Sequence, residues 1–208
     1  LFSATMPAPI AALAREFLRN PLPLNQERKA APATGITHAV YPVAQELKCG
    51  LLQALLRGDD MRSVLVFTRT KHRCNRLAEQ LMRAGDPNER IHGNRSQGQR
   101  TMALDAFKHG KARVLVATDI AARGIDIDEL SHVVNFDVPH VAEDYIHRAG
   151  RTARAGAVGE AVTFVAPDEM GDLRAIERAL GGSLPRRTLE GFDYSARPAE
   201  RLEVPPAT

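Results

Sequence analysis

The stretch VLVATDIAARGIDI, residues 114–127, decides the fold class. It opens with a short continuous apolar run and passes directly into Thr118 and Asp119. A second apolar run, SVLVF, occupies residues 63–67. Continuous apolar runs of this length are typical of strands that are covered on both faces, as strands of a parallel sheet are. The two runs therefore predict a buried parallel sheet.

Outward from these runs, apolar segments of strand length alternate with longer segments of helical spacing. The alternation predicts an α/β fold, a mainly parallel sheet with helices on both faces. The predicted strands are residues 38–43, 63–67, 90–92, 113–117, 132–135 and 160–165. The predicted helices are residues 46–56, 71–83, 97–108, 142–148 and 169–180.

The two ends of the chain differ in pattern from its middle. Residues 7–19 have the spacing of a short amphipathic helix, with Pro7 suited to its first turn. Residues 20–35 are rich in proline, alanine and polar residues, which predicts a linker. After Gly182 the pattern becomes irregular, and we expect an extended, partly disordered tail.

Composition limits the classes of protein to consider. The 208 residues carry a formal net charge of +3, so a nucleic-acid surface has to come from local clustering of charge. The two cysteines, Cys49 and Cys74, form no CxxC pair, which argues against a disulfide scaffold or a zinc finger and fits a reducing cytoplasm. No apolar run is long enough to span a membrane, and no signal peptide is recognisable. Because the chain opens with Leu1, we expect a piece of a longer protein.

Polar residues follow four of the predicted strands directly. Ligands of open α/β sheets bind beyond the carboxyl ends of the strands, so we expect this edge of the sheet to be functional. The residues concerned are Thr68–Lys71, His92–Asn94, Thr118–Asp119 and Asn135–Asp137.

The loop after Asp119 offers a nucleotide contact. Gly124 would let the backbone approach a ligand closely, and Asp126 could accept a hydrogen bond from a sugar hydroxyl. The alternative is that Asp119 and Asp126 only cap turns, and the stretch by itself favours neither.

The stretch RIHGNRSQGQR, residues 90–100, predicts a phosphate contact. Ser96 is a predicted N-cap, and the first helical turn after it would present free amides together with Gln97 and Arg100. The alternative is a capped helix start that is merely solvated.

The stretch FTRTKHR, residues 67–73, places threonines and cations directly after a buried strand. This composition suits contact with a nucleic-acid backbone, where half or more of the hydrogen bonds go to phosphate and sugar. The alternative is a basic loop in which Thr70 is an N-cap.

The stretch YIHRAGRTARAG, residues 145–156, spaces Arg148, Arg151 and Arg154 at intervals of three. One interpretation is a solvated helix face, but arginine is also the residue best suited to bidentate phosphate contact. The chain contains neither a GxxxxGK(S/T) phosphate loop nor an acidic DEAD run. Arginines that face a triphosphate would therefore need another domain to hold it, which is the logic of an arginine finger.

In this order, the motifs resemble those of the C-terminal RecA-like domain of DEAD-box ATP-dependent RNA helicases. The resemblance covers residues 1 to about 180, and the ordered set is far more specific than any single motif. The motifs are SAT at 3–5, VFTRTK at 66–71, HG with QxxR at 92–100, TD with ARGID at 118–126, and HRAGRTAR at 147–154. HGNRSQGQR and residues 184–198 further resemble the bacterial RhlE-like subgroup.

The resemblance implies a RecA-like three-layer sandwich and two kinds of partner. ATP and Mg²⁺ would be held mainly by an absent N-terminal RecA-like domain of the same chain, so this fragment alone would be inactive. RNA would be the other partner, no membrane would be involved, and the tail is a candidate for further protein or RNA contacts. The implied parts are the end of the N-terminal helicase domain at 1–20, an interdomain linker at 21–36, the C-terminal RecA-like domain at 37–182 and the extended tail at 183–208.

The resemblance also implies roles for the nucleotide-binding residues. Arg151 and Arg154 would contact the terminal phosphates of ATP across the cleft between the domains and stabilise charge in the transition state. Asp126 would bind the ribose, with Gly124 beside it.

Further roles concern coupling and RNA. His147 would contact the segment of Ser3 and Thr5 and link hydrolysis to RNA binding, whereas Arg148 would be structural. The phosphates and 2′-hydroxyls of one RNA strand would be held by Thr70, Gly93, Gln97, Arg100 and Thr118.

Three positions depart from the family pattern. Ala149 stands where a branched apolar residue is usual, which would loosen packing, and Ala153 replaces the usual glycine before Arg154. Asn94 stands where aspartate is commoner, which fits the RhlE-like subgroup. None of the three removes a positive charge.

Together these inferences predict the second motor domain of a cytoplasmic, RNA-dependent ATPase that unwinds short RNA duplexes. Two rival functions are a non-catalytic RNA-binding or scaffold domain that kept the fold, and a helicase or translocase that acts on DNA. The presence of both Arg151 and Arg154 argues against the first rival, because binding alone does not need them. Comparing the stimulation of the ATPase by RNA and by DNA distinguishes the second rival from an RNA helicase.

Overall fold

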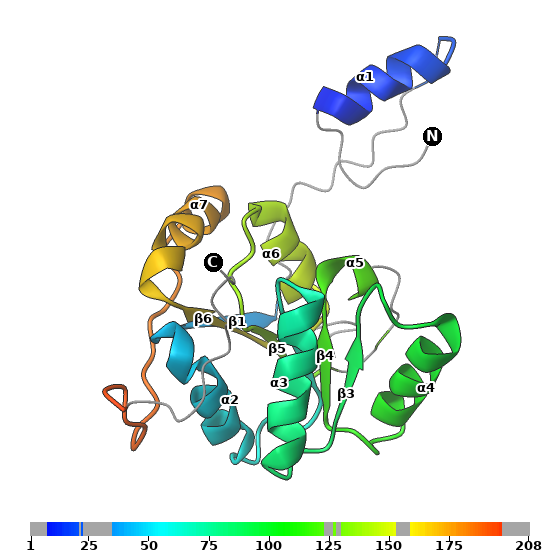
Figure 1. Cartoon of the computed structure of the whole chain (residues 1–208). Helices are drawn as coiled ribbons and strands as arrows, with labels where there is room; N and C mark the ends of the chain where they lie inside the picture. Colours follow the sequence, from blue (N-terminus) through cyan, green and yellow to red (C-terminus); the bar gives the residue numbers. More distant parts are fainter. Residues whose placement is uncertain are drawn as a thin grey trace, which may run out of the picture. The chain divides into compact units, whose positions relative to one another are not determined.

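A computed structural model describes residues 8–20, 22, 35–122, 127, 130–152 and 159–196 of the chain (Figure 1). The chain divides into two compact units, residues 1–30 and residues 31–208. The first unit contains helix α1 (Ala8–Phe17), which lies within the helix predicted at residues 7–19.

The second unit is built on one six-stranded sheet in which every strand pair is parallel (Figure 1). The order across the sheet is β1-β6-β5-β2-β4-β3. The fold class predicted from the apolar runs is therefore confirmed. The strands are β1 (Ile36–Pro42), β2 (Val64–Phe67), β3 (Asn88–Ile91), β4 (Val114–Ala117), β5 (His132–Asn135) and β6 (Gly159–Val165).

Most helices begin and end close to the predicted residues. Helices α3 (Lys71–Arg83) and α4 (Gln97–Lys108) match the predicted bounds because their N-caps are encoded locally. The Thr70 hydroxyl accepts from the backbone of Arg73 at 3.2 Å, and Ser96 forms a capping box with Gln99. The others are α2 (Lys48–Leu56) after a 3₁₀ turn (Gln45–Leu47), α5 (Asp119–Ala122), α6 (Ala142–Ala149), and α7 (Met170–Leu180) after a 3₁₀ turn (Pro167–Glu169).

The helices cover both faces of the sheet, as alternation along β4 shows. Val114 and Val116 pack in one core cluster with α2 and α3, whereas Leu115 and Ala117 pack in another with α4 and α5. A third cluster joins β1 and β6 to α6 and α7 on the same face as α4. All four β4 side chains are buried, which is why the strand reads as a continuous apolar run. Among the described helices, none is long and apolar enough to cross a membrane.

The segment after Gly182 differs from the partly disordered tail that the sequence predicts. Its backbone pairs with β1, because Val40 donates to Pro185 and Arg187 donates to Val40, each at 2.8 Å. Further along, Phe192 and Tyr194 pack against the core cluster that contains α2. Residues 184–194 are therefore part of the folded domain, and residues 197–208 lie outside the described residues.

A buried ion pair ties α2 to the turn before α7. The ammonium group of Lys48 is fully buried, donates to the carbonyl of Phe136 at 2.8 Å and pairs with Glu169. Glu169 also accepts from the backbone of Val138 at 3.3 Å and Ala166 at 3.0 Å. Burial lowers the pKa of Lys48, while the charge of Glu169 acts in the opposite direction. Lys48 thus depends on Glu169 for compensation, and Glu169 is paired with Arg69 as well, at 3.3 Å.

We expect Lys48→Met to lower the free energy of unfolding of this chain by about 3 kcal/mol, because the buried charge of Glu169 would lose its buried cation and keep the exposed guanidinium of Arg69. Urea denaturation measures the change. Arg113→Met is the control, since its ion pair with Asp86 is half-exposed and contributes about 1 kcal/mol or less. Equal losses in the two variants would contradict the assignment.

Candidate functional site

The carboxyl edge of the sheet gathers the polar residues that follow its strands. Backbone bonds continue beyond the strand ends, from Thr68 to the Ala117 carbonyl at 2.9 Å and from Thr118 to the Ile91 carbonyl at 3.2 Å. Because β2, β4 and β3 are neighbours, the segments that follow them meet at one edge. The structure therefore brings together three predicted contacts, Thr70, Thr118 and Gly93.

The remaining predicted RNA contacts lie in the first turn of α4. Gln97 is exposed, whereas Arg100 is half-buried and donates to the carbonyl of Ala121 at 3.1 Å. Arg100 thus ties α4 to α5. Thr118, which is buried at 8% exposure, starts α5 through its carbonyl, which accepts from Ala121 and Ala122 at 3.0 Å. Arg100 and Thr118 therefore hold α4 and α5 in place at the carboxyl edge.

His92 is locked in one neutral form beside Gly93. Its Nδ1 accepts from the backbone of Asn94 at 3.3 Å, so Nε2 carries the hydrogen that is donated to Asn75 Oδ1 at 3.0 Å. Burial lowers the pKa of His92, and the nearby cations Arg95, Arg90 and Lys71, together with His72, lower it further. This convergence of positive charge makes the surface around Gly93 attractive to phosphate.

Arg148 forms the densest polar contact at the edge. Its guanidinium is 3% exposed and grips the carboxylate of Asp119 with a fork of two bonds, at 2.6 and 2.7 Å. It also donates to Asn135 Oδ1 at 3.1 Å and to the carbonyl of Asp137 at 2.9 Å. The group lies over the ring of Phe67, 5.0 Å from its centroid. The structural role expected for Arg148 follows from these contacts.

These contacts revise the interpretation of the three regularly spaced arginines. Arg148 is inside the protein, and α6 ends at Ala149, so Arg151 lies beyond the helix that carries Arg148. Gly150 and Arg151 continue as a turn, in which the Arg151 amide donates to the Arg148 carbonyl at 3.0 Å. His147 is exposed and Arg151 is half-buried. The buried Arg148 therefore anchors the segment that carries His147 and Arg151.

Two arginines of FTRTKHR form ion pairs with buried carboxylates of the protein. Arg73 is only 12% exposed and pairs with the fully buried carboxylate of Asp137 at 2.9 Å. Arg69 donates to Glu169 and to the carbonyl of Val138, each at 3.3 Å. Both guanidiniums compensate buried carboxylates. Arg69, Thr70, Lys71 and His72 are the exposed polar residues of this stretch.

Five of the predicted site residues lie outside the described part of the chain. They comprise the two coupling residues, the two residues of the ARGID loop and one arginine finger, namely Ser3, Thr5, Gly124, Asp126 and Arg154.

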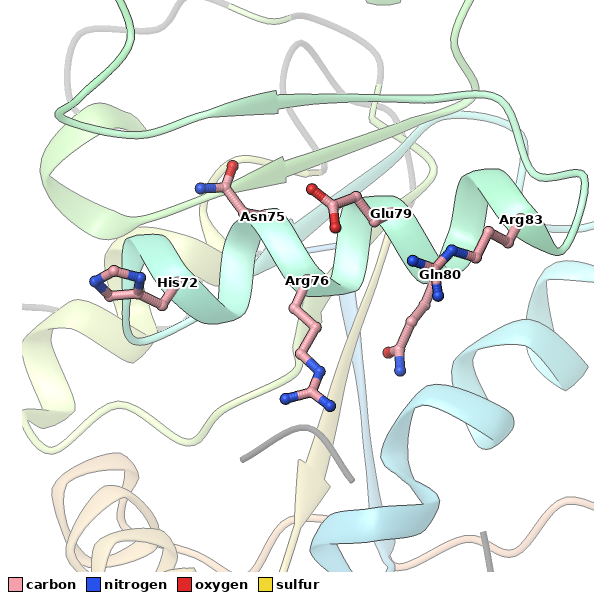
Figure 2. Close-up of a pocket in the computed structure, with 6 residues that line it drawn as sticks. All are labelled: His72, Asn75, Arg76, Glu79, Gln80 and Arg83. Carbon is pink, nitrogen blue, oxygen red and sulfur yellow. The ribbon is translucent and has the colours of Figure 1, made fainter. Parts of the chain in front are cut away.

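A cavity of about 310 Å³ lies along the outer side of α3 (Figure 2). Its lining includes three basic side chains, His72, Arg76 and Arg83. Figure 2 shows Asn75 and Glu79 on the side of α3 nearer to β3, whereas Arg76 and Gln80 point the other way. The cavity on α3 therefore combines two guanidiniums, those of Arg76 and Arg83, with the carboxylate of Glu79.

Sequence reasoning missed helix α5 and the partners of the buried cations. Helix α5 has four residues, too few to show a helical period. The partners come from distant positions, such as Asp119 for Arg148 and Asp137 for Arg73. The sequence did contain one signal for these partners, because Asp119 and Asp137 both come directly after buried strands.

An all-parallel sheet covered by helices on both faces, with threonines and cations at its carboxyl edge, defines a RecA-like domain. Residues 47–156 match the helicase conserved C-terminal domain family. The chain belongs to this family, as the C-terminal RecA-like domain of a DEAD-box RNA helicase.

Curated relatives support this assignment. The DEAD-box ATP-dependent RNA helicase CshA of Bacillus subtilis (strain 168) is 45% identical over 204 residues, which are 98% of this chain and 41% of the relative. The ATP-dependent RNA helicase DbpA of the same strain is 42% identical over 181 residues, 87% of this chain and 38% of the relative. The chain thus spans about two fifths of the length of these relatives.

Solved structures agree with the fold. The E. coli DEAD-box protein SrmB, bound to regulator of ribonuclease activity A, matches with a TM-score of 0.74 and 36% identity over 80% of this chain and 98% of that chain. S. cerevisiae Dbp5, bound to RNA and ADP BeF3, matches with a TM-score of 0.78 and 31% identity over 90% of this chain and 50% of that chain.

The different roles of the spaced arginines predict different stability effects in this chain. We expect Arg148→Ala to lower the free energy of unfolding by at least about 2 kcal/mol, because Asp119 and Asn135 lose a buried partner. Arg151→Ala is the matched variant and should cost about 1 kcal/mol or less. Urea denaturation of both variants measures the difference, and similar losses would refute it.

Proposed function

We propose that the chain is the second motor domain of an ATP-dependent RNA helicase and works with a preceding domain that holds ATP and Mg²⁺. The observation that carries the proposal is the anchoring of α6 by Arg148. This contact fixes the helix that bears His147, and the turn with Arg151 follows at once. A preorganised guanidinium needs little reorganisation when negative charge develops beside it.

The described side chains fit the phosphates of ATP better than they fit a metal ion. Guanidinium groups such as that of Arg151 make charge-assisted, bidentate bonds to phosphate oxygens. Among the described residues, no group of three or more His, Cys, Asp or Glu is placed to hold a metal ion. Magnesium is accordingly assigned to the preceding domain.

RNA binding is assigned to the carboxyl edge. The exposed residues Thr70, Gly93 and Gln97 offer hydroxyl, backbone and amide groups, and the cations around His92 attract phosphate. Contacts of this kind hold the sugar–phosphate backbone and do not read base edges. The expected recognition is therefore of an RNA strand regardless of sequence, with Thr118 and Arg100 completing the edge.

In the proposed mechanism, RNA and ATP together close this domain over its neighbour. Bound ATP supplies the phosphoryl group that is transferred to water. Arg151 and Arg154 then stabilise the charge on the terminal phosphates, and Asp126, with Gly124, holds the ribose. His147 would couple to the segment of Ser3 and Thr5 and link hydrolysis to RNA binding. Because closure bends the strand held at the edge, a short duplex opens, and we place this activity in the cytoplasm.

The finger role predicts the effect of removing a guanidinium from the full-length protein. Arg151→Ala or Arg154→Ala should lower RNA-stimulated ATP turnover by about 10³- to 10⁵-fold, because transition-state charge loses its partner. RNA affinity should persist, as measured by fluorescence anisotropy. Arg178→Ala, an exposed arginine on α7, is the control and should leave turnover unchanged. Near-normal turnover in both finger variants would exclude the role.

The division of labour between domains predicts that this 208-residue chain alone hydrolyses no ATP, with or without RNA or DNA. A phosphate-release assay tests this. Any residual rate should be the same in Arg151→Ala, which identifies contamination. A rate that depends on Arg151 in the isolated chain would show that the preceding domain is dispensable.

A further inference from the structure

A chain of buried hydrogen bonds crosses the sheet beneath α6. Arg148 Nη1 donates to Asn135 Oδ1 at 3.1 Å, and Asn135 Nδ2 donates to Thr163 Oγ1 at 3.1 Å. The Thr163 hydroxyl bonds to the hydroxyl of Tyr145, which lies 2.8 Å from His38 Nδ1. This series of hydrogen bonds therefore joins β1, β6 and β5 to α6.

Strand register places these groups in line. Asn135 of β5 is directly opposite Thr163 of β6, and Thr163 is opposite Val40 of β1, two residues from His38. Residues that are directly opposite each other on neighbouring strands point to the same face of the sheet. Here that face packs against α6. Asn135 and Thr163 are fully buried and Tyr145 is 1% exposed, so water does not compete for their bonds.

The arginine at one end fixes the direction of the first two bonds. A guanidinium has five donors and no acceptor, so Asn135 must present its oxygen to Arg148 and its NH₂ to Thr163. Thr163 accepts there and donates its own hydrogen to Tyr145. A buried phenol has to donate its own hydrogen, and His38 Nδ1 is an acceptor that lies beside it at 2.8 Å, so we infer that Nδ1 is the unprotonated nitrogen.

The ionisation of the terminal groups agrees with this direction. Burial lowers the pKa of His38, which favours the neutral imidazole. Burial also raises the pKa of Tyr145 to about 12, and the nearby carboxylate of Glu177 acts in the same sense. The phenol therefore keeps its hydrogen at neutral pH and can donate it. The near-parallel rings of His38 and Tyr145, with centroids 5.8 Å apart, add packing to the bond.

We propose that Tyr145 is a positioning residue for ATP hydrolysis, which holds α6 and its arginine segment in register through the chain from His38 to Arg148. Tyr145 and Arg148 are three residues apart on α6 and share its inner face. These hydrogen bonds therefore fix the inner face of α6 at two residues, Tyr145 and Arg148. His147 lies between these residues and Arg151 follows within one turn. The inference rests on the proposed function and adds a residue to it.

The test is Tyr145→Phe in the full-length protein, because phenylalanine keeps the ring and removes both hydrogen bonds. We expect kcat for RNA-stimulated ATP turnover to fall by about tenfold, with KM for ATP and RNA affinity changed by about twofold or less. The control is Tyr41→Phe, which removes a buried phenol hydroxyl from the opposite face of the same sheet. An unchanged kcat in Tyr145→Phe, or an equal loss in Tyr41→Phe, would overturn the proposal.

A second pair of variants guards against misfolding of Tyr145→Phe. His38 is half-buried, so substitutions there are better tolerated. His38→Gln keeps an acceptor for the tyrosine hydroxyl and should retain most of the turnover, whereas His38→Leu should lose about as much as Tyr145→Phe. Equal turnover in the two His38 variants would also overturn the proposal.

A spectroscopic readout separates this inference from the proposed function. In ¹⁵N NMR of the 208-residue chain, His38 should carry its hydrogen on Nε2, and Tyr145→Phe should redistribute the tautomers. A hydrogen on Nδ1 in the unmodified chain would refute the bond direction on which the inference depends. Absence of RNA-stimulated turnover in the unmodified full-length protein would instead refute the proposed function, whatever the tautomer.

Discussion

The structure of the carboxyl edge depends on one buried cation, the guanidinium of Arg148. Four hydrogen bonds link it to the start of α5 and to the end of β5. A charge at 3% exposure is tolerable only with such complete compensation, so its partners are as constrained as the arginine itself. The helix that bears His147, and the turn that bears Arg151, inherit this constraint because they are continuous with it.

The parallel sheet makes the constraint possible. Six strands that run in one direction place their carboxyl ends on one edge, where turns from distant parts of the sequence become neighbours. The same register that forms the apolar core aligns Asn135 with Thr163, so a polar path crosses an otherwise apolar face. Core packing and the proposed chemistry therefore rest on the same strand pairings.

Positive charge near the edge serves two different purposes. Arg73 and Arg148 are largely buried and compensate carboxylates or carbonyls inside the protein, whereas Lys71 stays exposed beside His92. In the sequence these cations look alike. What separates them is whether a buried acceptor lies within reach, which is a property of strand order and not of local composition.

The sequence by itself determined the class of fold, the bounds of α3 and α4, and the gathering of polar residues at one edge. These follow from short-range rules, since apolar runs, N-caps and strand ends are written in neighbouring residues. Only the tertiary structure decided that Arg148 is internal and that residues 184–194 pack on the domain. The same holds for the ion pairs of Asp137 with Arg73 and of Glu169 with Lys48. Each of these contacts joins residues far apart in the chain, and the free energy of a buried charge depends on partners that local sequence does not specify.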